Sequence, residues 1–396
     1  MVKSYLFLFL LAITGYLPVH AQHDSSVKGY SVEQHNGSNL RLSIITCTSG
    51  NEPWEAFGHC SIRIIDSTKN GIDRDLVYNY GVLDFFDASF EYKFFNGKMT
   101  ALLDTFIYDQ FVREYAEEKR GMDEYVLLLN NRQKDSIASF IANNMLTENK
   151  YYTYVDFFDN CTTRIRDLFI KVFGKSLVWG QAIPKGSRMT FRESFNEYCA
   201  YNYWIKLSLN IFFSGRTDKI LSNTESMYLP SYLCNGLVTA SINGQKICSE
   251  KITILEDKLP KPSSINPPFL IFLFIALLTI ISLSVERLTI LGKGMSILVL
   301  FTTGILGCCI LYAWFGSGHN FWRNNFNILW ALPTNIIIPF LGPKIKAKYA
   351  LVAMCLLGAS LIVHILKVQV MPLFEIGPLL LALLWVYGVM YRKSKV

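Results

Sequence analysis

The chain contains little charge for its length and few histidines. Of its 396 residues, 17% are Asp, Glu, Lys or Arg and 51% are hydrophobic, which is too apolar for a simple soluble protein. Lysine and arginine form no stripe interleaved with aromatic residues, so the net charge of +7 gives no indication of a nucleic-acid partner. Much of that charge lies in short loops between apolar runs of the last third, where it orients membrane helices.

The N-terminus has the pattern of an export signal over residues 1–21. Lys3 supplies the positive start, and residues 5–16 form an apolar core that is short for a membrane span. Val19-His20-Ala21 fits a small-residue cleavage site. No cysteine follows that site, so we do not expect a lipoprotein. Residues 22–39 are polar, and we expect them to be a flexible stretch.

A globular domain is predicted over residues 40–257. Alternating and aromatic runs predict strands at 40–47, 59–66, 76–80, 124–129 and 151–158, with Gly81 ending the third. Helical periodicity predicts helices at 109–119, at 131–146 after an Asn130 cap, and at 162–169. The aromatic stretch 198–213 fits either core or the lining of an apolar groove. A stiff, proline-rich linker follows at 258–268.

Five apolar runs occupy 269–390, each near the length that crosses a bilayer, and the third is interrupted by Pro333 and Pro339. The loops after the first, third and fifth runs carry the most cations: Arg287, Lys293, Lys344, Lys346, Lys348, Arg392, Lys393 and Lys395. The alternate loops contain only Arg323 and Lys367. Positive charge stays in the cytoplasm, so the globular domain is predicted outside and the tail 391–396 inside. We expect a multi-pass inner-membrane protein with an all-α domain of five membrane helices.

His59 and Cys161 are the residues with the strongest indication of chemistry. Cys161 follows Asp159-Asn160, either of which is a plausible cap, so the thiol stands at a predicted helix start. Free N–H groups at such a start stabilise a thiolate and can hold an oxyanion. His59 lies on a predicted strand, directly after a glycine, which is a rigid mount for a base. A sheet that carries the base, with the nucleophile at a helix start, fits an α+β papain-like arrangement.

Other interpretations of these residues remain open. A cysteine in an exported protein is more often a disulfide partner, and a lone histidine is more often structural. Besides His59, the mature soluble part has only His23 and His35, both in the polar N-terminal stretch, so a base in the folded domain would be His59. A zinc site of His59, Cys60 and Cys161 lacks a CxxC spacing, and adjacent strand residues point to opposite faces. We expect no metal and no cofactor.

The nine cysteines fall into two groups. Cys308, Cys309 and Cys355 lie within apolar runs and are expected to be packing residues. The other six face an oxidising compartment, and their even number permits disulfides without showing them. They are Cys47, Cys60, Cys161, Cys199, Cys234 and Cys248. We expect Cys234 and Cys248 to be the pair, since they are close in sequence and away from the motifs.

The order of five motifs resembles a family of exported bacterial proteins. Gly58-His59 is followed by Tyr78-Asn79-Tyr80-Gly81 and then by Asp159-Asn160-Cys161-Thr162-Thr163-Arg164. Thr190-Phe191-Arg192 and Met227-Tyr228-Leu229-Pro230 add to the match. This order resembles Lnb, a lipoprotein N-acyltransferase family, over most of the chain. The family is similar to circularly permuted NlpC-like and LRAT-like thiol enzymes, in which histidine precedes cysteine.

The resemblance implies acylation of the α-amine on the N-terminal cysteine of diacylated lipoproteins. It implies a phospholipid or other lipid as acyl donor, the lipoprotein as acceptor, and both held in the membrane. Cys161 carries over as nucleophile and His59 as base. Asn79 is our choice for the orienting third member, with Asp84 as the alternative. The rival interpretations are a membrane-tethered cysteine hydrolase of the cell wall and a non-enzymatic exported binding or assembly module.

Overall fold

The computed structural model describes residues 39–67, 74–84, 87–200, 202–260 and 264–392. The predicted signal peptide and nearly all of the predicted flexible stretch therefore lie outside the described residues. The chain divides into two compact units. A sheet unit contains Met1–Met189 and Ile220–Lys261, and a helical unit contains Thr190–Lys219 and Pro262–Val396. Thr190–Lys219 thus groups with the C-terminal helices, which differs from the single domain expected at 40–257.

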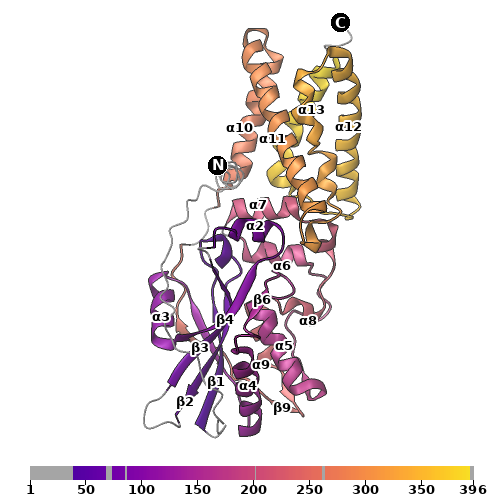
Figure 1. Ribbon diagram of the computed structural model, residues 1–396. Coiled ribbons are helices and arrows are strands. Elements are labelled where there is room, and N and C mark those ends of the chain that lie inside the picture. Colours follow the sequence, from indigo (N-terminus) through magenta and orange to yellow (C-terminus); the bar gives the residue numbers. More distant parts are fainter. Residues whose placement is uncertain (1–38, 68–73, 85–86, 201, 261–263, 393–396) are drawn as a thin grey trace. The chain divides into compact units, whose positions relative to one another are not determined.

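The sheet unit is built on seven antiparallel strands in the order β10-β5-β1-β2-β3-β4-β6 (Figure 1). Their bounds are β1 Leu40–Cys47, β2 His59–Asp66, β3 Arg74–Leu83, β4 Thr100–Ile107, β5 Met122–Val126, β6 Tyr151–Thr153 and β10 Ile252–Leu255. A second sheet pairs β7 Leu177–Val178, β8 Ser241–Ile242 and β9 Gln245–Lys246. The strands predicted at 40–47 and 59–66 are confirmed to the residue.

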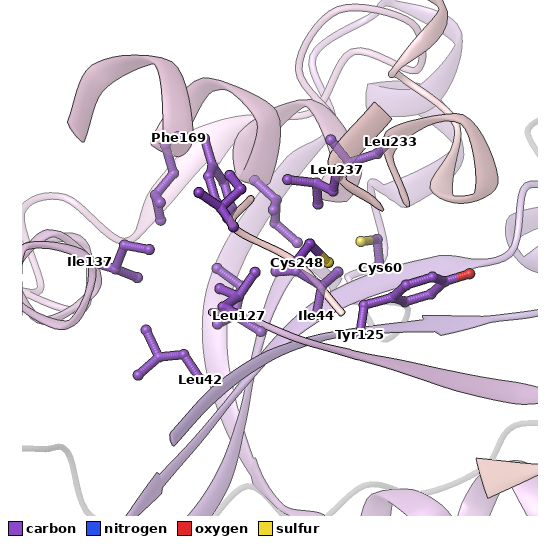
Figure 2. Packing of buried hydrophobic residues seen from close by; sticks show 14 of the residues in the cluster. Leu42, Ile44, Cys60, Tyr125, Leu127, Ile137, Phe169, Leu233, Leu237 and Cys248 are labelled. Atoms are coloured by element: carbon purple, nitrogen blue, oxygen red, sulfur yellow. The ribbon is translucent and has the colours of Figure 1, made fainter. Parts of the chain in front are cut away.

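Helices cover both faces of this sheet. α4 (Asn131–Asn144), α5 (Cys161–Phe173) and α9 (Pro230–Val238) lie on one face, and α3 (Tyr108–Glu117) lies on the other (Figure 1). Neighbouring residues of a strand are buried in different cores, one on each face of the sheet, because side chains alternate along a strand. Ile44 packs in the larger core with residues of α4, α5 and α9 (Figure 2), whereas Ile45 packs with Phe111 of α3. α2 (Phe90–Phe95) and α8 (Asn223–Ser226) complete the unit.

Three predicted strands end at other residues than expected. The strand predicted at 124–129 is β5, which runs over Met122–Val126. β3 does not stop at Gly81 but runs to Leu83, because a shift of register between Asn79 and Val82 lets the strand pass the glycine. The aromatic run 151–158 forms a strand only over Tyr151–Thr153. Beyond it the chain turns, with an isolated bridge between Val155 and Asp159, and delivers Cys161 to the start of α5.

The helical unit contains four helices, among its described residues, that are long and apolar enough to cross a membrane. They are α10 Pro267–Ser284, α11 Thr289–Phe315, α12 Pro343–Ile365 and α13 Leu373–Arg392 (Figure 1). The fifth membrane helix that we expected at the third apolar run is not confirmed. The third apolar run forms only short 3₁₀ turns: η7 Phe326–Leu329, η8 Pro333–Ile336 and η9 Ile338–Phe340.

Proline and a close approach of backbones explain this difference. Pro333 and Pro339 lack an N–H and interrupt any continuous helix. Gly307 of α11 lies so close to the run that an added Cβ would come within 2.1 Å of the Ala331 carbonyl oxygen. Asn335 is fully buried and bonds three side chains: Thr303 at 2.9 Å, and Tyr349 and Tyr387 at 2.7 Å each. Such partners let a non-helical backbone persist among membrane helices.

The segment Thr190–Lys219 is held to the loops of the helical unit by buried polar groups. It forms α6 (Phe191–Tyr198), α7 (Tyr203–Phe212) and η4 (Gly215–Asp218). Arg192, 3% exposed, donates to the Asp218 carboxylate and to three backbone carbonyls. Asp218 in turn accepts the Val370 N–H at 3.0 Å. The aromatic residues of 203–212 therefore belong to the helical unit and not to the core of the sheet unit.

The expected Cys234–Cys248 disulfide is not present. Every cysteine among the described residues is a free thiol. Cys60, Cys234 and Cys248 are each fully buried in the larger core, and the Cys60 thiol hydrogen-bonds to Cys234. The pairing was predicted from the short distance between the two cysteines in the sequence. In the structure, Cys234 of α9 instead packs against Cys60 of β2.

Candidate active site

Cys161 is the first residue of α5, and its position is fixed by a capping box. Asn160 is the N-cap: its Oδ1 accepts the Thr163 N–H at 2.8 Å, and the Thr163 hydroxyl accepts the Asn160 N–H at 2.7 Å. The Asn160 amide also donates to the carbonyl of Tyr228, at 2.9 Å, from the segment that leads into α9. Cys161 is 7% exposed. The thiol therefore stands at the N-terminal end of a well-capped helix, where the helix dipole favours a thiolate.

His59 is the first residue of β2, opposite Cys47 of β1. Gly58 precedes it with φ +69°, and a Cβ there would lie 2.4 Å from the Cys47 carbonyl oxygen, so only glycine fits. The His59 Nε2 lies 3.0 Å from the Asn79 Oδ1 of β3, which can only accept a hydrogen bond. Nε2 therefore carries the proton in this pair, and Nδ1 is left to face the thiol. His59 and Cys161 hydrogen-bond through their side chains.

Gly81 lets the third strand pass close to Cys161. Its φ is +87°, a conformation that favours glycine, and it falls at the register shift of β3. A Cβ at this position would lie 3.4 Å from the Cys161 Cβ and 3.3 Å from the ring of Tyr154. The shift keeps Asn79 directed at His59 while the strand continues beside the thiol. Asn79 and Gly81 are thus both positioned by the same register shift of β3.

The charges of the two reacting groups favour each other. Burial by itself raises the pKa of the Cys161 thiol, but the charge and hydrogen bond of His59, the N–H of Cys60 and the Thr162 hydroxyl hold it below its ordinary value of 9.0. Burial by itself lowers the pKa of His59, but the charge and hydrogen bond of Cys161 and the bond to Asn79 raise it above 6.5. Both directions favour a thiolate paired with an imidazolium at neutral pH.

Aromatic residues surround the thiol. Burial raises the pKa of Tyr152 and Tyr154, and the charge of Cys161 adds to the effect on both. The Tyr152 hydroxyl is buried and has no hydrogen-bond partner among the described residues. Arg164 lies over its ring, 3.8 Å from the centroid, and is held there by Asp159. A thiolate in this apolar setting depends on the His59 pairing, because the charge of His59 is the largest of the effects that lower the pKa of Cys161.

The three predicted site residues are brought together from β2, β3 and α5. Asp84, the alternative partner of His59, follows the end of β3 and is exposed, whereas Asn79 is 3% exposed and bonds the ring. Sequence reasoning missed the Cys60 N–H, which donates to the thiol, and the Tyr228 carbonyl, which holds the cap. The stretch Met227-Tyr228-Leu229-Pro230 matched the family by its side chains, but it contacts the site through the backbone carbonyl of Tyr228.

Metal ligands do not gather at this site. Within the residues that the structure describes, no group of three or more His, Cys, Asp or Glu side chains could hold a metal ion. The side chains that meet His59 are instead the acceptor Asn79 and the thiol of Cys161. Asn79, His59 and Cys161 therefore form one chain of hydrogen bonds.

Two family models match the chain and together span most of it. Residues 28–192 match the Lnb N-terminal periplasmic domain, and residues 260–395 match the Lnb transmembrane domain. Comparisons with curated proteins and with solved structures found no match. The thiol–imidazole site lies within the first match and the four apolar helices within the second. The chain therefore belongs to the Lnb family, membrane proteins of lipoprotein processing.

Proposed function

We propose that this protein is a lipoprotein N-acyltransferase. In this proposal Cys161 takes an acyl chain from a membrane lipid as a thioester and passes it to the α-amine of the N-terminal cysteine of a diacylated lipoprotein. The observation that carries the proposal is the hydrogen-bonded chain from Asn79 through His59 to Cys161, in a protein with four apolar helices. The antiparallel sheet with a thiol at a helix start supports a papain-like relationship.

The first half-reaction follows from the charges of the pair. The Cys161 thiolate attacks the carbonyl carbon of the donor ester, and the new oxyanion is held by the free N–H groups of the first turn of α5. The His59 imidazolium gives its Nδ1 proton to the departing alkoxide. A lysolipid leaves, and the acyl chain remains on the sulfur as a thioester.

The second half-reaction uses the same groups in reverse. The α-amine of the lipoprotein attacks the thioester carbonyl, His59, now neutral, accepts a proton from the amine, and the thiolate of Cys161 leaves. The product is an amide, and the thiolate–imidazolium pair is restored. A thioester needs no ATP, which suits the periplasmic side of an inner membrane, where we propose that the sheet unit works. Membrane anchoring of both substrates supports the reaction through proximity.

The proposal is tested on the N-termini of lipoproteins. Cells with the gene deleted are complemented with the natural protein, with Cys161→Ala, or with Cys199→Ala, which removes a buried thiol of the helical unit. Mass spectrometry of lipoprotein N-terminal peptides is expected to find the N-linked acyl group with the natural protein and with Cys199→Ala only. Unchanged lipoproteins together with altered muropeptides on deletion would replace the proposal with a cell-wall hydrolase.

A further inference from the structure

Three loop segments of the helical unit meet at one junction, and each carries an exposed cation close to the junction along the chain. Ser214 donates its N–H to the Phe321 carbonyl at 2.7 Å. Gly215 lies so close to the 366–370 loop that an added Cβ would stand 2.0 Å from the Val368 carbonyl oxygen. Within two residues of these contacts along the chain lie Arg216, Arg323 and Lys367, all exposed.

The junction itself is rigid. Asn325, fully buried, donates to the carbonyls of Ile211 and Phe212 at 2.8 Å each and accepts from Gln369 at 2.8 Å. Asp218 is tied to Val370 and to Arg192. These bonds join the same three segments that carry the exposed cations. The cations therefore stand on fixed backbone, so little ordering is required when a ligand binds them.

The three cations are not neutralised within the unit. In the part of the chain that the structure describes, no ion pair involves Arg216, Arg323 or Lys367. The acid nearest to Arg216 in the chain is Asp218, and its carboxylate is already committed to Arg192. An anion is the complement that this junction lacks.

The sequence keeps two of these cations at a cost. Lys367 follows the end of α12 with φ +54°, and its backbone closes the helix with the 6→1 bond from Val368 to Val363, at 3.0 Å. Glycine is the usual residue at such a position, because a side chain strains the left-handed conformation. Arg323 and Lys367 also occupy the two loops that, by the charge of the others, face outward, where cations are disfavoured by topology.

Exposed apolar residues adjoin the junction. Phe315, at the end of α11, is 74% exposed, and Leu366 and Val368, on both sides of Lys367, are 68% and 48% exposed. Trp322, in the loop after α11, is only 4% exposed and packs on Phe212 and His319. Cations beside exposed apolar surface match an amphiphile with an anionic head and acyl tails.

We propose that Arg216, Arg323 and Lys367 bind the phosphodiester of a phospholipid headgroup at the outer end of the helical unit. This inference rests on the proposed function, because it identifies the acyl donor as a phospholipid of the outer leaflet. The arginines match phosphate oxygens in the bidentate manner, and the lysine adds a point charge. The exposed apolar residues beside them contact the acyl chains. A neutral diglyceride lacks the group that these cations recognise.

The test measures lipid retention by the full-length protein in mild detergent, by native mass spectrometry. The probes are phosphatidylglycerol and a diacylglycerol with the same acyl chains. The variant is Arg216→Gln/Arg323→Gln/Lys367→Gln, and the control is Arg132→Gln/Lys171→Gln/Lys175→Gln, which removes three exposed cations of the sheet unit. Removing outward-facing cations strengthens the charge bias of the topology, so insertion is expected to persist.

The variant is expected to need on the order of 100-fold more phosphatidylglycerol for half-saturation, while diacylglycerol binding and the control stay unchanged. Undiminished phosphatidylglycerol binding by the variant would overturn the proposal, as would an equal loss in the control or an equal loss of diacylglycerol. Cys161→Ala with its loop cations intact is expected to retain phosphatidylglycerol fully. That result separates the headgroup site from the acyl-transfer chemistry, since the two can then fail independently.

Discussion

Two networks of polar groups, one in each unit, serve opposite purposes. In the sheet unit, Cys161 and His59 shift each other's pKa toward a charged, reactive pair. In the helical unit, the side chains of Arg192 and Asn335 form hydrogen bonds with fixed structural partners. The difference teaches that burial and polarity alone do not identify an active site. A candidate site is marked by a group whose partner shifts its pKa, whereas a structural partner only completes its hydrogen bonds.

Replacing the nucleophile tests the reactive side of this comparison most strongly. Cys161→Ala should reduce N-acylation at least about 10³-fold, and Cys161→Ser nearly as much, because a hydroxyl is a far weaker nucleophile at neutral pH. The thermal unfolding of both variants should stay close to that of the natural protein. Lipoprotein acylation assayed in membranes gives the result, and full activity of Cys161→Ala would end the thiol mechanism.

Replacing the base should change both rate and pH dependence. His59→Ala is expected to lose roughly 10²–10⁴-fold in activity. The alkylation rate of Cys161 should rise with pH through an inflection below 9.0 in the natural protein. Without His59, burial dominates, so the inflection should move upward. An inflection that stays in place after His59→Ala would show that the imidazole does not stabilise the thiolate. Cys199→Ala serves as the control for alkylation at other thiols.

The structural side of the comparison is tested at Arg192. Arg192→Leu leaves the Asp218 carboxylate buried and unpaired, which should cost about 3–5 kcal/mol of stability. The exposed control Arg132→Leu should change stability by no more than about 0.5 kcal/mol. Denaturation in detergent provides the measurement. If Arg192→Leu were as stable as the control but altered the pH profile of acylation, the Arg192 network would have to be regarded as reactive.

Asn79 lies between the two purposes, as a positioning residue. Asn79→Ala should lower activity up to about 10²-fold by freeing the imidazole ring, less than the loss of His59. Because its Oδ1 accepts the Nε2 proton, Asn79→Asp should raise the pKa of His59 further and shift the alkaline limb of the pH–rate profile upward. A purely structural Asn79 would lower stability without moving that limb, which the pH–rate profile of both variants decides.

The smallest effect is expected within the helical unit. Asn335→Leu removes three side-chain hydrogen bonds from the non-helical run, each worth about 0.6 kcal/mol among membrane helices. The free energy of unfolding is therefore expected to fall by roughly 2 kcal/mol. Thr302→Val, a matched change in α11, is expected to cause no measurable loss. Unfolding in mixed micelles measures the difference. Acylation abolished by Asn335→Leu at unchanged stability would assign Asn335 a direct role in the reaction.

The site was predictable because its signals are local. His59 is nearly the only histidine available to the folded domain, and Cys161 follows its own cap, so both could be named before their contact was known. Asn79 was also chosen over Asp84 from the sequence, because it lies on the strand after His59, and the structure has its Oδ1 3.0 Å from the His59 ring. The contribution of the Cys60 N–H was not predictable, because a backbone donor carries no residue-type signal.

The errors in the fold share one physical cause. Apolar composition predicted a helix at 326–341, but composition does not encode the approach of Gly307 or the bonds of Asn335 that permit 3₁₀ turns. Similarly, the aromatic residues of α7 signal burial without specifying which unit buries them. The Cys234–Cys248 pairing failed for the same reason, because spacing along the chain does not report on packing between β2 and α9.

The central claim is that Cys161 carries the acyl chain, and it is tested most directly on the protein itself. Full-length protein is incubated with phospholipid vesicles in the absence of a lipoprotein acceptor, digested, and analysed by mass spectrometry. The peptide containing Cys161 is expected to gain the mass of one acyl chain, to lose it on treatment with neutral hydroxylamine, and to remain unmodified in His59→Ala. An unmodified Cys161 under conditions in which the same preparation acylates lipoproteins would contradict the account.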